Sequence, residues 1–211
     1  MSRLLIATNN AGKLSELREL LAGVPFELIS PSDIGLKLKV AETGRTYATN
    51  ARLKARAYAK ASGLLSLADD SGLEVYALNG APGVLSARYA GDEATDEMRV
   101  AFLLGNIPTT QLTERRARFR CVMAIATPDG KTRMVSGSCR GVIALEPRGA
   151  GGFGYDPIFH FPKLGKTMAE LPPELKNTIS HRAHAAHRAR MLLLDSHLIL
   201  ESTTTRGIYL K

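Results

Sequence analysis

The chain has 211 residues, of which 28 are lysine or arginine and 20 are aspartate or glutamate, so its formal charge is +8. With 45% hydrophobic residues it can bury a core without disulfides or metals, which excludes a mainly disordered chain. No apolar run approaches the roughly 18 residues of a membrane-spanning helix, and we expect no signal peptide and no membrane anchor. The positive charge predicts an anionic partner, whether nucleic acid, phosphate groups or a lipid surface.

The first quarter of the chain alternates short apolar runs with helical patterns. Residues 4–7 predict a strand, and leucines at helical spacing predict a helix from Lys13 onward. Residues 26–29 predict a second strand. Residues 46–62 are rich in alanine, arginine and lysine, and they predict a long helix that Gly63 ends.

The middle of the chain predicts one strand, one loop and one helix. Residues 64–68 predict a buried strand, and Asp69 and Asp70 begin a predicted loop at its carboxyl end, with Asp70 expected to be exposed. Thr95 is a typical helix cap, so residues 96–104 predict a helix.

A hairpin follows. Apolar residues alternate over 119–125, residues 128–130 form a Pro-Asp-Gly turn signal, and residues 132–145 predict the returning strand, so the sheet is mixed. The cysteines Cys121 and Cys139 could meet across this hairpin, but we favour reduced packing thiols in a reducing cytoplasm.

The last part of the chain predicts two helix starts. Residues 167–170 fit a capping box, which the following prolines cut short, and Ser180 caps a final helix that runs to Leu198. The chain contains no internal repeat and no linker. We therefore expect residues 1–211 to form a single α/β domain with two lobes.

The first candidate site is the sequence Thr-Asn-Asn-Ala-Gly-Lys at residues 8–13, between a predicted strand and a predicted helix. This geometry aims backbone N–H groups and the positive end of the helix dipole at an anion, and Lys13 could reach phosphate oxygens. The motif predicts a phosphate-binding loop, although it is not a Walker A sequence. An ordinary strand-to-helix turn is the alternative.

The second candidate is the pair of adjacent carboxylates Asp69 and Asp70. Hard oxygen ligands suit Mg²⁺, and Glu42 could supply a further carboxylate to the same ion. The pattern predicts a magnesium site. The alternative is a solvated turn in which Asp69 caps backbone amides.

The third candidate is Phe153, which stands between two glycines on a predicted loop. A stacking platform for a flat ligand would explain a ring in this position, and the alternative is a ring folded back into the local core. The fourth candidate is a set of donors, Lys176, His181 and Arg182, around a predicted helix N-terminus. Because these cations would repel a metal, we prefer a donor-lined or solvated helix face to a zinc site built on the regularly spaced histidines 181, 184 and 187.

A run of arginines precedes and enters the hairpin, at Arg115, Arg116, Arg118 and Arg120. We favour the exposed face and entry of a strand as its explanation, and a nucleic-acid-binding surface is the alternative.

Six separated motifs occur in order along the chain, at residues 8–13, 42–44, 68–73, 80–83, 152–157 and 180–182. Together they resemble the inosine/xanthosine triphosphate pyrophosphatases, which remove non-canonical purine nucleotides, and the resemblance extends over about residues 4–190. It implies an α/β fold in which helices flank a long central mixed β-sheet and the active-site cleft lies between two lobes. It also implies hydrolysis of ITP, dITP and XTP between the α and β phosphates, with Mg²⁺ as cofactor and a homodimer as the usual assembly.

The family's functional residues can be carried over position by position. The resemblance implies that Glu42 and Asp70 bind Mg²⁺ and that Asp70 is also the proton acceptor. It implies substrate-binding roles for Thr8, Asn9, Asn10, Ala11, Gly12, Lys13, Lys54, Ser71, Phe153, Gly154, Tyr155, Asp156, Lys176, His181 and Arg182. A 6-oxopurine presents a carbonyl where adenine presents an amino group, so buried donors aimed at that atom would accept hypoxanthine and reject adenine.

Three positions depart from the family pattern. Thr49 replaces a glutamate at the start of the long helix, Tyr76 replaces an aspartate and Asn79 replaces a glycine. The first removes an acid near the expected metal, and the others change the local charge and backbone. Two other functions stay open at this point: a pyrimidine triphosphate pyrophosphatase on a related fold, and a nucleic-acid-binding module.

Overall fold

The computed structural model describes residues 2–195, within which seven strands form one sheet in the order β2-β1-β3-β4-β5-β6-β7. The strands are β1 (Ser2–Ile6), β2 (Phe26–Ile29), β3 (Leu65–Val75), β4 (Arg116–Ala126), β5 (Thr132–Ile143), β6 (Phe159–Phe161) and β7 (Lys166–Thr167). β1 runs parallel to β2 and β3, and the remaining neighbours are antiparallel. The sheet is therefore mixed, as predicted.

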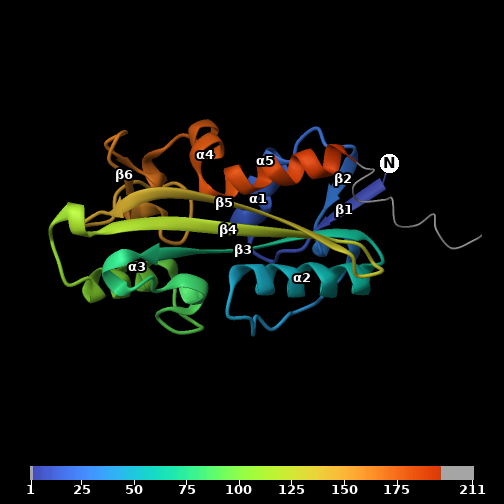
Figure 1. Ribbon diagram of the computed structural model, residues 1–211, viewed down its shortest axis with the longest axis horizontal. Helices are drawn as coiled ribbons and strands as arrows, with labels where there is room; N and C mark the ends of the chain where they lie inside the picture. The colour runs from blue at the N-terminus through green and yellow to red at the C-terminus, as the bar shows by residue number, and fades with distance from the viewer. Residues whose placement is uncertain (1, 196–211) are drawn as a thin grey trace, which may run out of the picture.

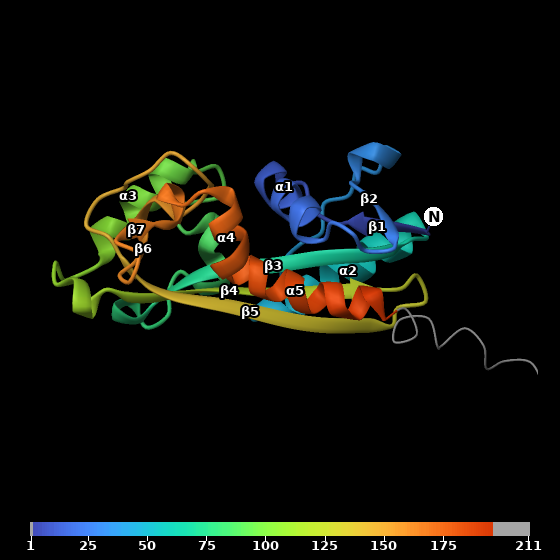
Figure 2. The ribbon, with the colours of Figure 1, turned by 90° about the horizontal axis from the view of Figure 1, so that it is seen from above.

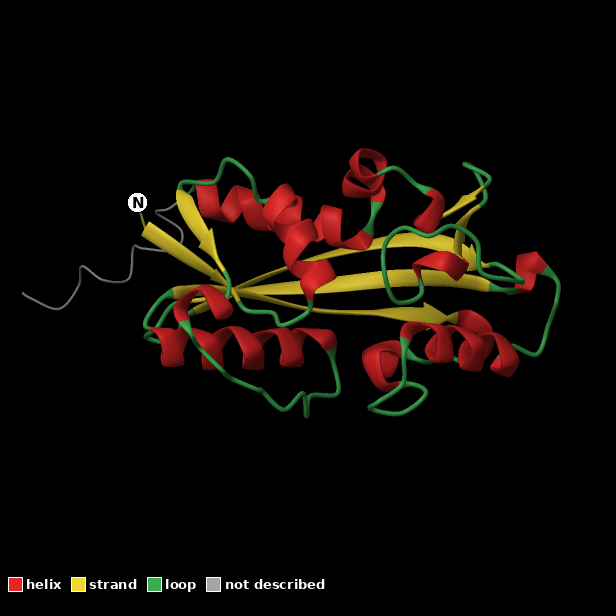
Figure 3. Cartoon of the chain, turned by 180° about the vertical axis from the view of Figure 1, so that it is seen from behind, coloured by secondary structure: helices red, strands yellow, loops and turns green. Residues whose placement is uncertain are grey.

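Helices lie on both sides of the three long strands (Figure 1). They are α1 (Ala11–Leu20), α2 (Tyr47–Ser62), α3 (Asp96–Asn106), α4 (Pro173–Ile179) and α5 (His181–Leu194), and a 3-10 helix, η3, spans Gly83–Arg88. Seen from above, α3, β6 and β7 lie at one end of the molecule and β1 and β2 at the other (Figure 2). Strands β3, β4 and β5 connect the two ends, as the view from behind also shows (Figure 3). This is the predicted two-lobed α/β arrangement.

The two faces of the sheet have separate cores. On one face, α1 and α5 cover Leu67, Cys121 and Met123. On the opposite face, α2 covers Ala68 and Val122. Neighbouring residues of one strand thus enter different cores, because side chains alternate across a strand. The same alternation continues into the site.

Most predicted elements are confirmed at their ends. Thr46 caps α2 through its side chain, and Gly63 ends it at φ 68, a left-handed conformation that glycine adopts without strain. The hairpin pairs Phe119 with Cys139, so the two cysteines are not opposite each other, and both are free and buried. The preference for reduced packing thiols is confirmed.

Four predictions need correction. Residues 69–72 are not a loop: β3 runs through them to Val75, and Asp70 is buried rather than exposed. The returning strand of the hairpin ends at Ile143, before the predicted Leu145. Arg115 is also buried, since its guanidinium donates hydrogen bonds to three backbone carbonyls. Helix α5 ends at Leu194, and the predicted end at residue 198 lies outside the described residues.

The departures at residues 49 and 79 have a local explanation. Asn79 sits at φ 53, and asparagine tolerates this left-handed conformation better than most residues that carry a side chain. Thr49 Oγ1 lies 2.9 Å from Thr46 Oγ1, so it joins the cap of α2. As for the membrane, none of the helices in the described part of the chain is long and apolar enough to span a bilayer.

Candidate active site

The loop between β1 and α1 presents a helix N-terminus to the site. Asn10 caps α1, because its side-chain oxygen accepts a hydrogen bond from the Lys13 backbone N–H at 2.8 Å. Thr8 Oγ1 accepts one from Asn10 N at 3.2 Å, and Asn9 Nδ2 donates to the Tyr58 hydroxyl at 3.3 Å. The loop is thus held from both sides at the N-terminus of α1, where the helix dipole favours an anion.

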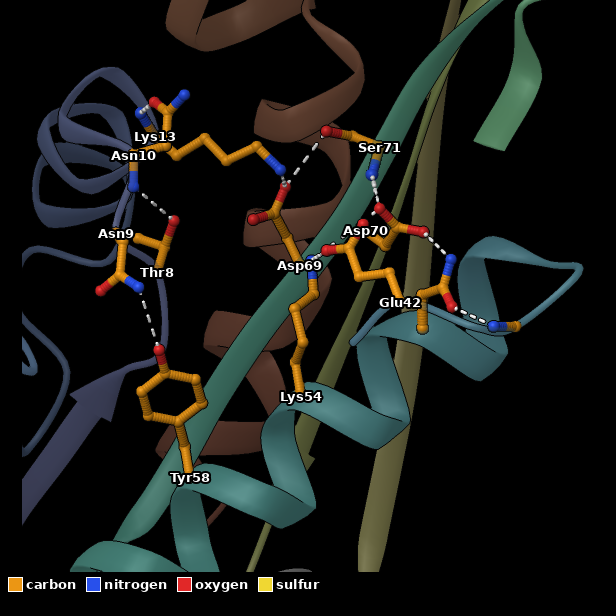
Figure 4. A network of polar contacts seen from close by, with 12 residues as sticks. Thr8, Asn9, Asn10, Lys13, Glu42, Lys54, Tyr58, Asp69, Asp70 and Ser71 are labelled. Carbon is orange, nitrogen blue, oxygen red and sulfur yellow. Dashed lines mark hydrogen bonds and ion pairs between the residues drawn. The ribbon is translucent and has the colours of Figure 1, made fainter. Parts of the chain in front are cut away.

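Asp69 and Asp70 point to opposite faces of β3 (Figure 4). Asp69 faces α1, where its Oδ2 lies 2.9 Å from Lys13 Nζ. Asp70 faces α2, where its Oδ2 accepts a hydrogen bond from Asn50 Nδ2 at 3.1 Å. Adjacent carboxylates in a strand are separated in this way, whereas in a loop both could have turned to one ion.

Asp69 joins the two ends of the site. Besides Lys13, its Oδ2 lies 3.5 Å from Arg182 Nη2 and accepts a hydrogen bond from Ser71 Oγ at 3.2 Å. Burial alone would raise the pKa of Asp69, but the charges of Lys13 and Arg182 outweigh it and hold that pKa far below its usual range. Asp69 is therefore a buried anion between two cations.

Asp70 and Glu42 meet at Lys54. The Lys54 ammonium lies 2.5 Å from Glu42 Oε1 and 3.9 Å from Asp70 Oδ1. Burial raises the pKa of Asp70 above its usual value; the charge of Lys54 opposes this shift and that of Glu42 adds to it. The two carboxylates that the family resemblance assigns to a metal thus face the same position.

This pair of carboxylates fits a divalent cation that takes some of its ligands from the protein and the others from the substrate and water. Within residues 2–195, no group of three or more His, Cys, Asp or Glu side chains could hold a metal. Mg²⁺ is commonly held in nucleotide enzymes by one or two carboxylates together with phosphate oxygens and water. The Glu42 and Asp70 oxygens have the right chemistry for that mode and not for an all-protein cage.

At the other end of the site, acidic side chains hold Lys176 and Arg182. Glu16 Oε1 lies 2.7 Å from Lys176 Nζ, and Glu16 Oε2 lies 2.6 Å from Arg182 Nη1. Asp156 Oδ2 lies 2.6 Å from Lys176 Nζ. The sequence has no acid between Glu174 and Asp195, but α1 and the segment of residues 152–156 bring Glu16 and Asp156 to these cations.

His181 is a neutral, buried ring. It stacks on Phe119 with ring centroids 4.5 Å apart. Burial and the neighbouring Arg182 place the pKa of His181 well below 6.5. Its Nδ1 is buried and has no hydrogen-bond partner among the described residues, and the same holds for Arg182 Nε.

Phe153 contacts both ends of the site. A Cβ on Gly12 would lie 2.6 Å from Phe153 Cδ1, so the ring lies directly against the phosphate loop. Lys176 Nζ and Arg182 Cζ each lie 5.3 Å from the centre of this ring. The Phe153 backbone N–H donates to Asp156 Oδ2 at 3.0 Å. The ring therefore lines the same cavity as Lys13 and Arg182 and belongs to none of the hydrophobic cores of the described residues.

One cavity joins these groups. From the predicted set it is lined by Asn10, Lys13, Glu42, Asp70, Ser71, Phe153, Gly154, Tyr155, Asp156, His181 and Arg182. The cavity lining does not include Thr8, Asn9, Ala11, Gly12, Lys54 or Lys176, but Thr8, Gly12, Lys54 and Lys176 contact residues that line it. The motifs that are far apart in the sequence are thus brought to one place.

Four residues of this arrangement were missed in the sequence. Glu16 lies one helical turn after Lys13, a spacing that puts both on one face of α1. Asn50 follows directly on a departure from the family pattern, and Asp96 and Arg99 line the cavity from α3. Only Glu16 had a usable signal, because its position relative to Lys13 follows from helix periodicity.

Comparison with known proteins gives a consistent result. Residues 4–191 match the model of the Ham1 family. A dITP/XTP pyrophosphatase of Geobacter sulfurreducens is 49% identical over 94% of this chain and 97% of its own length, and one of Bacillus subtilis is 45% identical over 92% and 98%. The solved structure of a HAM1 protein from Coxiella burnetii, 42% identical, aligns with a TM-score of 0.82 over 92% of this chain and all of that one. The chain therefore belongs to the Ham1 family.

Proposed function

We propose that the chain hydrolyses ITP, dITP and XTP between the α and β phosphates, giving the monophosphate and pyrophosphate. The observation that carries this proposal is a single cavity. It is lined by the carboxylates Glu42 and Asp70 and also by the Phe153 ring with the nitrogen-bearing side chains of His181 and Arg182. Relatives named dITP/XTP pyrophosphatase, similar over nearly the whole chain, support the substrate class.

The phosphate end performs the hydrolysis. Asp70 accepts a proton from water, whose oxygen attacks the α-phosphorus; the bond from that phosphorus to the bridging oxygen breaks, and its electron pair leaves with pyrophosphate. Lys13 and the N-terminus of α1 neutralise phosphate charge. Lys54 holds Glu42 beside Asp70.

The cofactor of this reaction is Mg²⁺, and Glu42 and Asp70 would hold it. When bound, the ion neutralises charge on the phosphate oxygens. The hard oxygen chemistry of the two carboxylates supports magnesium over softer metals. Isothermal titration with MgCl₂ and a non-hydrolysable ITP analogue tests this assignment, because Glu42→Gln should weaken magnesium-dependent binding of the analogue.

The base end selects the nucleotide. His181 Nδ1 and Arg182 Nε are buried and unpartnered among the described residues, and Phe153 offers a ring for stacking. A 6-oxopurine can satisfy donors that adenine, with its amino group, would leave unpaired. Phe153 to Asp156, Lys176, Ser71, His181 and Arg182 thus form the nucleoside half of the site.

A product assay tests the proposed function. The protein is incubated with Mg²⁺ and, separately, ITP, XTP, dITP, ATP, GTP, dTTP and UTP, and the products are separated by ion-exchange chromatography. We expect monophosphate and pyrophosphate from ITP, dITP and XTP. Release of orthophosphate with diphosphate would contradict the proposal, and faster turnover of dTTP or UTP would favour a pyrimidine pyrophosphatase instead.

The arginine run gives little support to nucleic-acid binding. Arg118 and Arg120 both pair with Glu74, and Arg115 is buried. A salt titration with single-stranded and duplex DNA tests this alternative, because several phosphate contacts would make the affinity fall steeply with salt. We expect no such binding.

We also propose that the chain is one cytoplasmic domain that assembles as a homodimer. The free, buried cysteines agree with a reducing compartment, and the family resemblance supports the dimer. Light scattering on the purified protein should give twice the chain mass of 22.8 kDa, and a value equal to the chain mass would contradict the dimer.

A further inference from the structure

One wall of the cavity is built by residues that have no role in the proposed reaction. Asp96 and Arg99 on α3, together with Ser86 and Ala87 on η3, line it. The Asp96 side chain and the Ser86 carbonyl contact the segment of residues 152–156, which carries Phe153. This wall therefore has to be explained separately from the proposed phosphate and base contacts.

Asp96 is tied directly to that segment. As the first residue of α3, behind the Thr95 cap, it accepts a hydrogen bond on Oδ2 from the Gly154 backbone N–H at 2.6 Å. Its Oδ1 pairs with Arg99 one turn later. Burial tends to raise the pKa of Asp96, but the hydrogen bonds from Arg99 and Gly154 outweigh it and lower that pKa, so the side chain stays charged.

Arg99 extends the connection to η3. Its Nη1 donates to the Ala87 carbonyl at 3.0 Å. Next to Gly154, the Tyr155 hydroxyl donates to the Ser86 carbonyl, also at 3.0 Å. The segment that carries Phe153 is thus held against α3 and η3 by two independent contacts.

Such anchors matter because this segment has no regular structure of its own. Gly152 and Gly154 both have positive φ, at 75 and 63, which leaves Phe153 between two residues of high backbone freedom. Asp156 binds the Phe153 N–H from one side, and Asp96 binds the Gly154 N–H from the other. Between them, the two carboxylates fix the peptide units on both sides of the aromatic ring.

We propose that Asp96 is a positioning residue for the base end of the site: through Gly154 it holds the Phe153 ring where a purine stacks. The inference rests on the proposed function, and it predicts a defect in base binding rather than in phosphate chemistry. Among the described residues, the Asp96 side chain forms its hydrogen bonds and ion pair with Gly154 and Arg99, and not with Lys13, Asp70 or Lys54.

The kinetic test compares Asp96→Ala and Asp96→Asn with Glu97→Gln. Glu97 is the matched control, because it is exposed, acidic and in the same first turn of α3. In Asp96→Ala the KM for ITP should rise about tenfold while kcat changes less than about twofold, since a charged hydrogen bond is lost. Asp96→Asn should be affected less, because its amide oxygen still accepts from Gly154 N, and Glu97→Gln should behave as the unaltered protein.

A binding test separates this inference from the proposed function. Calorimetric titration with inosine monophosphate reports the base end, and titration with inorganic triphosphate and Mg²⁺ reports the phosphate end. Asp96→Ala should weaken the first about tenfold and leave the second unchanged. If the unaltered protein failed to hydrolyse ITP, the proposed function would fall, whereas these titrations would still decide the role of Asp96.

Two results would overturn the role of Asp96. One is equal weakening of both ligands, which would mean a general structural effect. The other is unchanged binding of inosine monophosphate in a variant whose melting temperature is lower, which would mean that Asp96 contributes only to stability. If Asp96→Ala does not fold, the same two titrations on Asp96→Leu decide, because leucine keeps the branched shape of the side chain but has no oxygen to accept from Gly154 N.

Discussion

Asp69 and Asp70 are neighbours in the chain with the same side chain, and their surroundings give them different chemistry. Asp69 is held between Lys13 and Arg182, which keep it ionised. Asp70 faces Asn50, and its pKa is raised because burial and Glu42 together outweigh Lys54. The first is suited to holding cations in place, and the second to accepting a proton.

Replacing Asp70 by asparagine should abolish turnover and preserve the fold. The variant would lose the proposed proton acceptor, which contributes at least about 100-fold in comparable sites, together with one oxygen of the proposed metal site. The amide has nearly the same shape, and Ser71 N can still donate to it as it does to Asp70 Oδ1. Pyrophosphate release from ITP and the melting temperature check both parts; a variant with a near-normal rate would remove Asp70 from this role.

Replacing Asp69 by asparagine should instead destabilise the protein. Lys13 and Arg182 would lose their shared buried anion, and breaking such a pair costs about 3 kcal/mol. Urea unfolding of this variant beside Asp70→Asn measures the difference. Equal midpoints for the two variants would contradict the distinct roles of the two carboxylates.

His181 should make stability depend on pH. Its pKa in the fold lies well below 6.5, the value of an exposed histidine, so as the pH falls below 6.5 the unfolded chain binds a proton that the folded protein does not. Stability is then lost with falling pH, by up to about 1.4 kcal/mol per pH unit for one proton. Urea unfolding between pH 7 and 5 should show a smaller slope in His181→Gln, whereas the exposed His187→Gln should keep it.

Residue types were easier to predict than their partners. The motifs placed Lys13, Glu42, Asp70, Phe153 and Arg182 in one site, and one cavity does gather them. The pairing of Lys176 and Arg182 with an acid of α1 was not predictable, because it joins residues more than 150 positions apart that no local pattern relates.

At the scale of elements, β3 is longer than its sequence suggests. Asp-Asp-Ser-Gly is typical of turns, and residues 69–72 were therefore predicted as a loop. In the structure each of them pairs with a residue of β4, and the ladder continues to Val75. Gly72 also lets η3 pack closely on this part of β3, since a Cβ there would lie 2.3 Å from the Gly83 carbonyl oxygen. Tertiary pairing outweighs the local turn preference.

The contact between β5 and α5 should be sensitive to a single methyl group. A Cβ on Gly137 would lie 2.4 Å from both Ala185 N and the His181 carbonyl oxygen, so Gly137→Ala should displace the start of α5 and the side chain of His181. We expect a loss of about 1 to 3 kcal/mol and a higher KM for ITP. Gly105→Ala is the control, because its Cβ meets open space on α3, and its stability should be unchanged or raised by up to about 1 kcal/mol. Unchanged unfolding and kinetics in Gly137→Ala would contradict this contact.

At the scale of the whole molecule, the order of strands and helices followed from periodicity and caps. The parallel start and antiparallel remainder of the sheet agree with the prediction of a mixed sheet. Periodicity could not predict that α3 and the segment of residues 152–156 line the same cavity. Those contacts depend on how the two ends pack along the long strands, which no local signal records.

The site itself has little of the chain's positive charge. Its cations are already paired with acids of the same site, in the set Lys13, Lys54, Arg88, Arg99, Lys176 and Arg182 against Glu16, Glu42, Asp69, Asp70, Asp96 and Asp156. Six formal positive charges thus face six negative ones. A triphosphate with about four negative charges should therefore bind weakly in EDTA and tightly with Mg²⁺, as titration with a non-hydrolysable analogue would measure. Equal affinity in both conditions would contradict this balance.

This pairing also changes how the +8 charge of the chain should be understood. An anionic ligand would have to compete with these carboxylates for the cations of the site. We therefore expect the negative charge of a polyanion alone to contribute little to its affinity. A ligand that binds together with a cation and also fills the space beside Phe153 should interact with the site more favourably than the site's own carboxylates do. We therefore expect the acids of the site to compete with free phosphate, DNA and RNA for the cations of this cavity.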